Sequence, residues 1–388
     1  MNTGAAAMSC VMISELRKRY PDCHITMAID YGDGSVFDNL LCDILYLGSD
    51  SMKLLSHRLP IARYYKAIAK KILGREDAFN QAKRFKKETK SCDAAFDISG
   101  YILSSQWDLD GNLDKLGQMN VILDSKVPYY IMPQSFGPFN YGEQSDGMKS
   151  LIKNTLSRCK AVFAREQDGY RLLKDELSLR NIRYSPDIVL QSKEINWKVI
   201  YKDGCKATTE ISVPPHSVAV IPNLRILEKS DDETVMNIYS SIIGELRSLN
   251  KTVFLISHSA EDMVLCRKLK SKFLQENVCL IDQKMDSMTF EKVIQKMEFG
   301  VASRFHSIVH AYKNTVPCLV LGWAVKYREL ASLLDQEEYV FDVNELRNRE
   351  VMISALRQLN ERQTDEKTTI RNRMIEIQKS NCFDTLDF

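Results

Sequence analysis

The chain alternates short apolar segments with longer helical segments, and this alternation restricts its fold more than any other feature. Apolar strands are expected at 94–99, 129–133, 161–164 and 182–184, then at 217–222, 252–257, 278–281, 299–302 and 317–321. Each ends in Gly, Pro or a polar residue, and helical patterns separate most of them. Strands that alternate with helices predict an α/β fold with mainly parallel sheets, whose ligands bind at the carboxyl ends of the strands.

The length of 388 residues suggests two domains. The irregular, polar segment 192–215 ends in Pro214-Pro215 and is the best linker. We therefore predict an N-terminal domain at 1–195, and a C-terminal domain at 214–388 that ends in a helical tail.

The N-terminal domain opens with a predicted helix at 5–20, for which Asn2, Thr3 and Gly4 supply capping chemistry, followed by a strand at 23–29. A complete βαβ unit would place a strand before Asn2. We therefore expect the first strand of this domain to be missing.

Charge and cysteine content exclude several classes of protein. With 53 Lys and Arg against 51 Asp and Glu, a net charge of +2 argues against a dedicated nucleic-acid-binding protein. No apolar run approaches the roughly 18–20 residues of a membrane helix. The ten cysteines form no CxxC pair, which favours reduced thiols in a cytoplasmic protein over a disulfide framework or a zinc site.

One segment, 58–90, departs from this neutrality. It holds eleven Lys and Arg against three Asp and Glu, a net charge of +8, and its apolar residues recur at helical spacing. A basic amphipathic segment can lie on an anionic membrane or face an acidic ligand. The alternative is a solvated helix pair with one stripe facing the core.

The sharpest chemical motif is Ser303-Arg304-Phe305-His306, at the end of a predicted strand and the start of a helix. With Ser303 as the N-cap, the free N–H groups and dipole of the helix form an anion site, to which Arg304 adds recognition of carboxylate or phosphate. His306 can transfer a proton. The alternative is a surface Arg and a structural His. His310 shares this helix face, but no third ligand accompanies the pair, so we expect no metal.

Three other residues lie just beyond predicted strands. Arg165 is placed for anion binding, with an ion pair to Glu166 as the alternative. His258 can enter a cleft or occupy a turn, and Lys326 is either a ligand or a solvated cation. Gln134 and Ser135 offer polar groups on a tight loop, and Asp187 caps or turns the chain. No nucleophile elbow, Walker loop, HExxH or GxGxxG motif is present.

In this order, the motifs resemble the polysaccharide pyruvyl transferase family over residues 2 to 342. The matching pieces are 2–8, 97–100, 133–138, 164–166, 185–187, 256–258, 303–307, Pro317 and Lys326. The resemblance implies two Rossmann-like domains similar to the GT-B architecture. It also implies transfer of the pyruvyl group of phosphoenolpyruvate to sugar hydroxyls, giving a ketal and phosphate, with phosphoenolpyruvate as donor substrate and no cofactor. Two departures are the missing strand and Ser99-Gly100-Tyr101, where a second glycine often occurs.

The resemblance also implies site residues. Arg165, Arg304 and His306 match positions that bind and activate the donor. We expect the two arginines to clamp phosphoenolpyruvate, and His306 to act as general acid with His258 as a helper. Further substrate contacts are expected from His258, Lys326, Gln134, Ser135, Ser303, Asn2 and Gly4.

Three functional hypotheses follow. The first is pyruvylation of a glycan or its lipid-linked precursor during surface polysaccharide synthesis, by a protein that contacts the inner membrane face through 58–90. The second is a GT-B glycosyltransferase that uses a nucleotide-sugar. The third is a non-catalytic glycan-binding or assembly protein, suggested by the missing strand.

Overall fold

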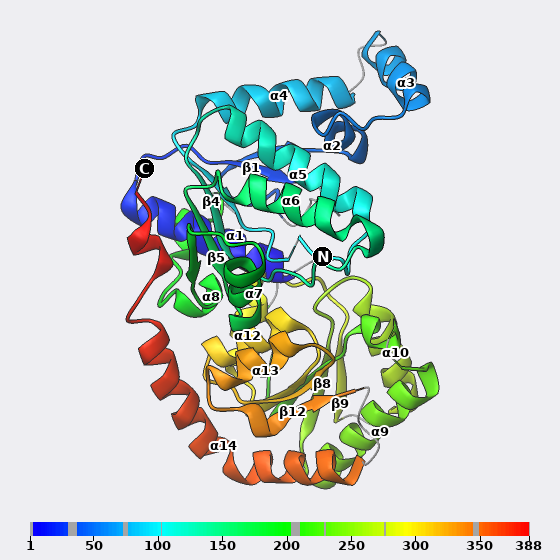
Figure 1. The fold of residues 1–388 in the computed structure, drawn as a ribbon. Helices are drawn as coiled ribbons and strands as arrows, with labels where there is room; N and C mark the ends of the chain where they lie inside the picture. Colours follow the sequence, from blue (N-terminus) through cyan, green and yellow to red (C-terminus); the bar gives the residue numbers. More distant parts are fainter. Residues whose placement is uncertain are drawn as a thin grey trace. The chain divides into compact units, whose positions relative to one another are not determined.

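The structure is a computed structural model that describes residues 3–29, 37–72, 77–101, 103–202, 210–228, 230–274, 277–343 and 349–387. The chain forms two compact units (Figure 1). Unit 1 comprises Met1–Val11, Val189–Trp197 and Asp203–Asn381, and unit 2 comprises Met12–Ile188, Lys198–Lys202 and Cys382–Phe388. The predicted domains are contiguous in sequence, whereas each of these units includes a short piece from the opposite end of the chain.

Unit 1 is built on a six-stranded sheet in which every neighbouring pair is parallel. Its strands are β7 (Ser217–Ile221), β8 (Thr252–Ile256), β9 (Val278–Ile281), β10 (Phe299–Ala302), β11 (Cys318–Gly322) and β12 (Val340–Asp342). The spatial order is β12-β11-β10-β7-β8-β9. Counted from β7, this is the 3-2-1-4-5-6 order of a doubly wound sheet, and the direction of winding reverses between β7 and β10. The predicted parallel α/β architecture is confirmed.

Helices connect the parallel strands and cover this sheet, so its central strands are buried along their whole length. They are α9 (Asp232–Ser248), α10 (Asp262–Lys272), α11 (Ser287–Gln295), α12 (Phe305–Lys313), α13 (Val325–Ser332) and α14 (Arg349–Ile377). Short 3₁₀ turns lie at η5 (Leu224–Glu228) and η6 (Glu337–Tyr339). The helical tail, α14, buries Met352, Leu356 and Leu359 in the same apolar core as β7 and α9.

Unit 2 holds a four-stranded parallel sheet in the order β3-β4-β5-β6 and a separate parallel pair, β1-β2. The strands are β1 (Thr26–Ile29), β2 (Asp43–Tyr46), β3 (Ala95–Asp97), β4 (Tyr129–Gln134), β5 (Ala161–Ala164) and β6 (Ile182–Tyr184). The predicted strand at 23–29 corresponds to β1.

The helices of unit 2 fill the connections between these strands. They are α2 (Ser49–Leu55), α3 (Ile61–Ile72), α4 (Ala78–Ser91), α5 (Leu109–Asp124), α6 (Ser145–Leu156), α7 (Gln167–Arg171) and α8 (Ile188–Gln191). Shorter turns are η2 (Gly142–Gln144), the π turn η3 (Leu172–Glu176), η4 (Trp197–Val199) and η7 (Cys382–Thr385). The basic segment 58–90 contains α3 and α4. In the described part of the chain, no helix is both long and apolar enough to cross a bilayer.

Helix α1 (Thr3–Arg19) begins earlier than predicted, so Thr3 and Gly4 lie within the helix rather than before it. Asn2 lies outside the described residues. The first turns of α1, up to Val11, belong to unit 1, and the remainder belongs to unit 2. Gly4 is therefore placed with the C-terminal sheet, far from it in sequence.

Candidate active site

The reversal of winding between β7 and β10 marks the candidate site in unit 1. Asn223 follows β7 and is buried, and its Nδ2 donates to the carbonyl oxygen of Ser303, which follows β10, at 3.0 Å. Doubly wound sheets bind ligands beside such a reversal, at the carboxyl ends of the strands. Sequence reasoning missed Asn223, although it follows a predicted strand in the same way as His258.

The helix at this edge starts one residue later than predicted. Arg304 is the N-cap of α12, with extended backbone (φ −97°, ψ 128°), and Phe305 is the first helical residue. The N-cap assignment of Ser303 is therefore wrong. Its hydroxyl instead shares a 2.6 Å hydrogen bond with the hydroxyl of Tyr239, in the core. The prediction that His306 lies in the first turn is confirmed.

Acidic residues at the start of α10 hold the Arg304 guanidinium. Nε donates to Asp262 Oδ2 at 2.9 Å, and Nη2 donates to Asp262 Oδ1 at 2.6 Å, to Ser259 Oγ at 2.9 Å and to Glu261. Burial disfavours the charged form, but these carboxylate partners prevail and raise the pKa of Arg304. Nη1 has no hydrogen bond to any described residue, and the side chain is 18% exposed. One terminal nitrogen is thus left for a ligand.

His306 lies against the start of α1. A Cβ added to Gly4 would stand 2.4 Å from His306 Cγ and 2.5 Å from Nδ1, far inside contact distance. Only glycine therefore allows α1 to approach the half-buried imidazole this closely. The imidazole also meets the ring of Phe305 edge to face at a centroid distance of 5.5 Å. Two predicted site residues, Gly4 and His306, are in this way brought together.

His258 is buried rather than presented at the surface. Its ring packs edge to face on Phe290 at 5.3 Å and lies 6.4 Å from the ring of His310. Burial, followed by the nearby His310, His306 and Arg304, lowers the pKa of His258 well below its usual value. Burial therefore favours the neutral imidazole, which is less suited to donating a proton directly. Within the described ranges, no three His, Cys, Asp or Glu side chains are grouped to hold a metal ion.

Lys326 lies beyond β11, in the first turn of α13. Its Nζ is 5.8 Å from the ring centroid of Phe305 and 5.7 Å from that of Tyr327. The Tyr327 hydroxyl donates to the Ser303 carbonyl oxygen at 3.1 Å, which ties α13 to the same edge. The structure thus places Lys326 beside the helix start that carries Arg304 and His306.

Unit 2 has its own polar cluster at the carboxyl ends of β4 and β5, centred on Arg165. Its guanidinium donates to Ser135 Oγ at 2.8 and 3.1 Å, to Glu166 Oε1 at 3.0 Å and to Asp187 Oδ2 at 2.9 Å. The arginine is 5% exposed, and both carboxylates are buried. This geometry favours the ion-pair alternative over the predicted clamp on the donor, because all three nitrogens already have partners in the protein.

Gln134 ends β4 beside this cluster and is 1% exposed. Among the residues that the structure describes, neither its amide oxygen nor its amide nitrogen has a hydrogen-bond partner. A buried polar group without a partner costs about 1–3 kcal/mol, so such groups call for an explanation, and a ligand is one. At the end of β3, Asp97 is also buried, but Lys115 at 3.3 Å and the Ser99 N–H at 2.8 Å outweigh burial and lower its pKa.

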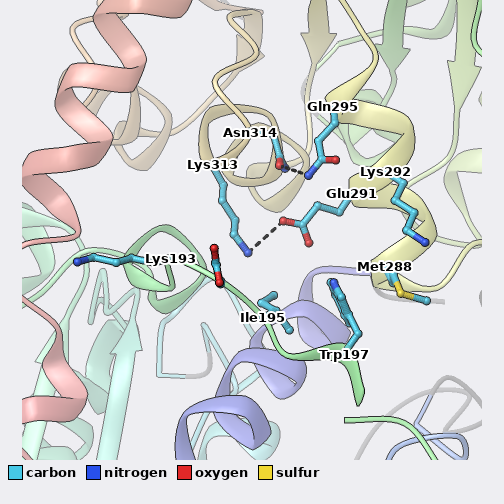
Figure 2. A pocket seen from close by; sticks show the side chains of 10 residues that line it. Lys193, Ile195, Trp197, Met288, Glu291, Lys292, Gln295, Lys313 and Asn314 are labelled. Atoms are coloured by element: carbon cyan, nitrogen blue, oxygen red, sulfur yellow. Dashed lines mark hydrogen bonds and ion pairs between the residues drawn. The ribbon is translucent and has the colours of Figure 1, made fainter. Parts of the chain in front are cut away.

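A cavity of about 350 Å³ lies elsewhere in unit 1 (Figure 2). It is bounded by residues 193–197, α11 and the C-terminal end of α12, with an ion pair between Lys313 and Glu291 at 3.1 Å and a hydrogen bond from Gln295 to Asn314 at 2.8 Å. The nine residues of α12 span about 13 Å, so this cavity adjoins the end of the helix opposite His306. It is therefore distinct from the candidate site around Arg304 and His306.

With this geometry established, comparison with known proteins identifies the family. The family model for polysaccharide pyruvyl transferases matches residues 2–324. The chain belongs to the polysaccharide pyruvyl transferase family. Membership supports a transferase that modifies polysaccharide, and the match includes Gly4, Arg165, His258, Arg304 and His306. No curated protein sequence matches the chain.

Solved structures with the same fold are distant in sequence from this family member. The UDP-GlcNAc 2-epimerase of Neisseria meningitidis, bound to UDP-GlcNAc, has a TM-score of 0.57 at 11% identity, covering 95% of this chain and 92% of that one. The S. aureus MnaA–UDP structure has a TM-score of 0.52 at 12% identity, covering 90% of this chain and 92% of that one. The E. coli trehalose-6-phosphate structure with UDP-2-fluoro glucose has a TM-score of 0.52 at 10% identity, covering 97% of this chain and 94% of that one. These similarities support the predicted GT-B-like fold class with two Rossmann-like domains. At such low identities they concern the fold alone.

Proposed function

We propose that this protein transfers the pyruvyl group of phosphoenolpyruvate to two hydroxyls of a glycan or lipid-linked sugar in the cytoplasm, during surface polysaccharide synthesis. The methylene carbon of the donor takes up a proton and becomes the ketal methyl group. Two sugar oxygens form bonds to the central carbon, and the bond from that carbon to the phosphate oxygen breaks. Of the two hydroxyl protons released, one balances the proton on the methyl group and the other leaves with phosphate.

The observation that carries this proposal is the pairing of Arg304 and His306 at the start of α12, within the region that matches the family. Phosphoenolpyruvate is a compact polyanion, so its site needs positive groups and N–H donors. Nη1 of Arg304, the N-terminal N–H groups of α12 and the ammonium of Lys326 supply them from one sheet edge. The carboxylates beside Arg304 fix its orientation but cancel much of its charge, so Lys326 and the helix start carry a large share of the attraction.

His306 is the proposed general acid toward the methylene carbon. It lies in the first turn of α12, and its ring contacts both the start of α1 at Gly4 and the ring of Phe305. A held imidazole loses little freedom when it transfers a proton, which favours this role. The buried, neutral His258 is assigned a supporting role, in which it packs behind the site with Phe290 and His310.

Separately from the donor site, we propose that the polar edge of unit 2 binds sugar. The Gln134 amide offers one acceptor and two donor positions without partners among the described residues, which suits sugar hydroxyls. Arg165 is a positioning residue here, since it holds Ser135 next to Gln134 through two hydrogen bonds.

The test is to incubate the purified protein with phosphoenolpyruvate and candidate acceptors, measuring phosphate release together with the ketal by NMR. We expect equal amounts of both, and a loss of about 10²–10⁴-fold in His306→Asn. His24→Asn is the matched control, because that histidine is exposed and its ion pair is on the surface of unit 2. Full activity in His306→Asn would refute the assignment of the acid. Turnover of a nucleotide-sugar without turnover of phosphoenolpyruvate would favour the glycosyltransferase alternative, with which the UDP-bound structures of similar fold are compatible.

A further inference from the structure

Helix α3 (Ile61–Ile72) exposes an apolar stripe. Ile61, Tyr65 and Ile72 are 76%, 67% and 79% exposed, and their spacing of four and seven residues places them on one side of the helix. Large apolar side chains exposed to this extent along one helix side are typical of a surface that meets a partner or a membrane. Other residues of α3 attach the helix to the rest of unit 2. Ala67 is buried, and the ring of Tyr64 packs on the ring of Phe79 in α4 at a centroid distance of 5.1 Å.

The remainder of α3 is basic. Arg63, Lys66, Lys70 and Lys71 are all exposed, and the helix contains no acidic residue. Only Arg63 makes an ion pair within the described residues, to Asp50 at 3.2 Å. A helix with an exposed apolar stripe and a Lys- and Arg-rich polar face matches the pattern of helices that lie in the plane of an anionic membrane surface.

Helix α4 adds a second basic surface next to α3 (Figure 1). Its buried residues are Ala82, Phe85 and Thr89. The solvent-facing side carries five exposed cations, none of which forms an ion pair with a described residue: Lys83, Arg84, Lys86, Lys87 and Lys90. Cations at this density, without an ion pair to any described residue, favour an anionic partner.

We propose that α3 and α4 together form a docking surface for an anionic phospholipid membrane, with the α3 stripe inserted at the level of the headgroups and the α4 cations on the anionic surface. The positive charge of α3 and α4 favours an anionic membrane over a second copy of this chain as the partner. A second copy of this chain would bring the same positive surface, and the resulting repulsion would oppose pairing. The 12 residues of α3 are about 18 Å long, which suits a helix lying on a bilayer and is too short to span one. Presentation of a lipid-linked acceptor is the use that rests on the proposed function, whereas binding to the membrane does not depend on it.

The test is co-sedimentation of the full-length protein with vesicles of phosphatidylcholine containing phosphatidylglycerol, compared with phosphatidylcholine alone. We expect binding to the anionic vesicles that weakens at least tenfold at high salt, where surface charges are screened. The triple variant Ile61→Ser, Tyr65→Ser, Ile72→Ser should lower the partition coefficient about tenfold or more. The matched control is Val264→Ser with Leu274→Ser, which removes apolar side chains that are 62% and 80% exposed in unit 1 and should leave binding unchanged.

A second variant tests the charge. Lys83→Glu, Lys86→Glu and Lys87→Glu should abolish the preference for anionic vesicles, whereas the same change at exposed Lys153, Lys160 and Lys296 should not. Equal binding to both kinds of vesicle, or none at low salt, would overturn the proposal. Loss of a dimer in the Ser variant by size-exclusion chromatography would assign the stripe to a second copy instead. Turnover of a soluble acceptor should survive in all these variants, so that failure of membrane binding and failure of the proposed activity remain distinguishable.

Discussion

The two sheets each place an arginine at the carboxyl end of a strand, Arg165 directly after β5 and Arg304 two residues after the end of β10, yet the two arginines differ in what their surroundings leave available. Arg165 in unit 2 is buried, with a side chain that is 3% exposed, and its guanidinium donates hydrogen bonds to Ser135, Glu166 and Asp187. Among the residues that the structure describes, Arg304 in unit 1 is held through Nε and Nη2 only, and its side chain remains 18% exposed. Arginine at the end of a parallel strand therefore has a structural role in unit 2, as Arg165, and is a candidate ligand-binding residue in unit 1, as Arg304.

The largest expected effect is on stability in unit 2. Arg165→Gln leaves two buried carboxylates without their cation, which costs about 3–5 kcal/mol of unfolding free energy. Urea denaturation followed by circular dichroism measures it. Arg158→Gln, at a surface ion pair with Asp124, is the control and should change stability by about 0–1 kcal/mol. A small effect at Arg165 would mean that its ion pairs contribute little to the stability of unit 2.

Next in size is an effect on activity in unit 1. Under the proposed function, Arg304→Gln should reduce kcat/KM for phosphoenolpyruvate about 10²–10³-fold, because it removes the Nη1 donor that is proposed to contact this substrate. Its cost in unfolding free energy should be smaller than that of Arg165→Gln, since Asp262 keeps the backbone N–H donors of Leu224 and Ser259. Arg267→Gln, a surface position on α10, is the control. The contrast between the arginines fails if the stability loss at Arg304 equals that at Arg165.

A smaller effect tests the contact between α1 and His306. Gly4→Ala places a methyl group against the imidazole, so the ring has to move and kcat should fall by about 10–100-fold. Gly244→Ala is the matched control, because a Cβ there, within α9, meets nothing within 4 Å. It should retain activity and gain up to about 1 kcal/mol in unfolding free energy. Equal activity of the two variants would separate Gly4 from the site.

The smallest effect is a difference in acid sensitivity between the units. The pKa of His258 in the folded state is lowered, so below about pH 6.5 the unfolded chain binds the proton first and unit 1 loses stability as the pH falls. The loss is about 1.4 kcal/mol for each pH unit over which only the unfolded chain is protonated. In unit 2, the lowered pKa of Asp97 gives stability that is present above about pH 3.9 and lost only below it.

Hydrogen exchange followed by mass spectrometry resolves this difference. Between about pH 6.5 and pH 4.5, peptides from β8 should lose protection while peptides from β3 keep it. His258→Gln should flatten the dependence in β8. Parallel loss in both units would show that His258 does not govern the acid response.

The sequence by itself determined the fold class and the sheet edge at which the candidate site lies. Apolar segments at 217–222, 252–257 and 299–302 predict strands because periodicity and turn residues are local properties, and the polar residues after them necessarily lie at the carboxyl ends. The helical character of 58–90 and its charge follow from composition in the same way.

Only the tertiary structure decided which of these residues are available and which are sealed. The partnership of Arg304 with Asp262 spans 42 residues, that of Arg165 with Asp187 spans 22, and Gly4 meets His306 from the opposite end of the chain. Such pairs depend on strand order and helix packing, which local patterns do not encode. Burial then determines the outcome: full enclosure by carboxylates fixes Arg165 in place, whereas partial enclosure leaves Arg304 one nitrogen for a ligand.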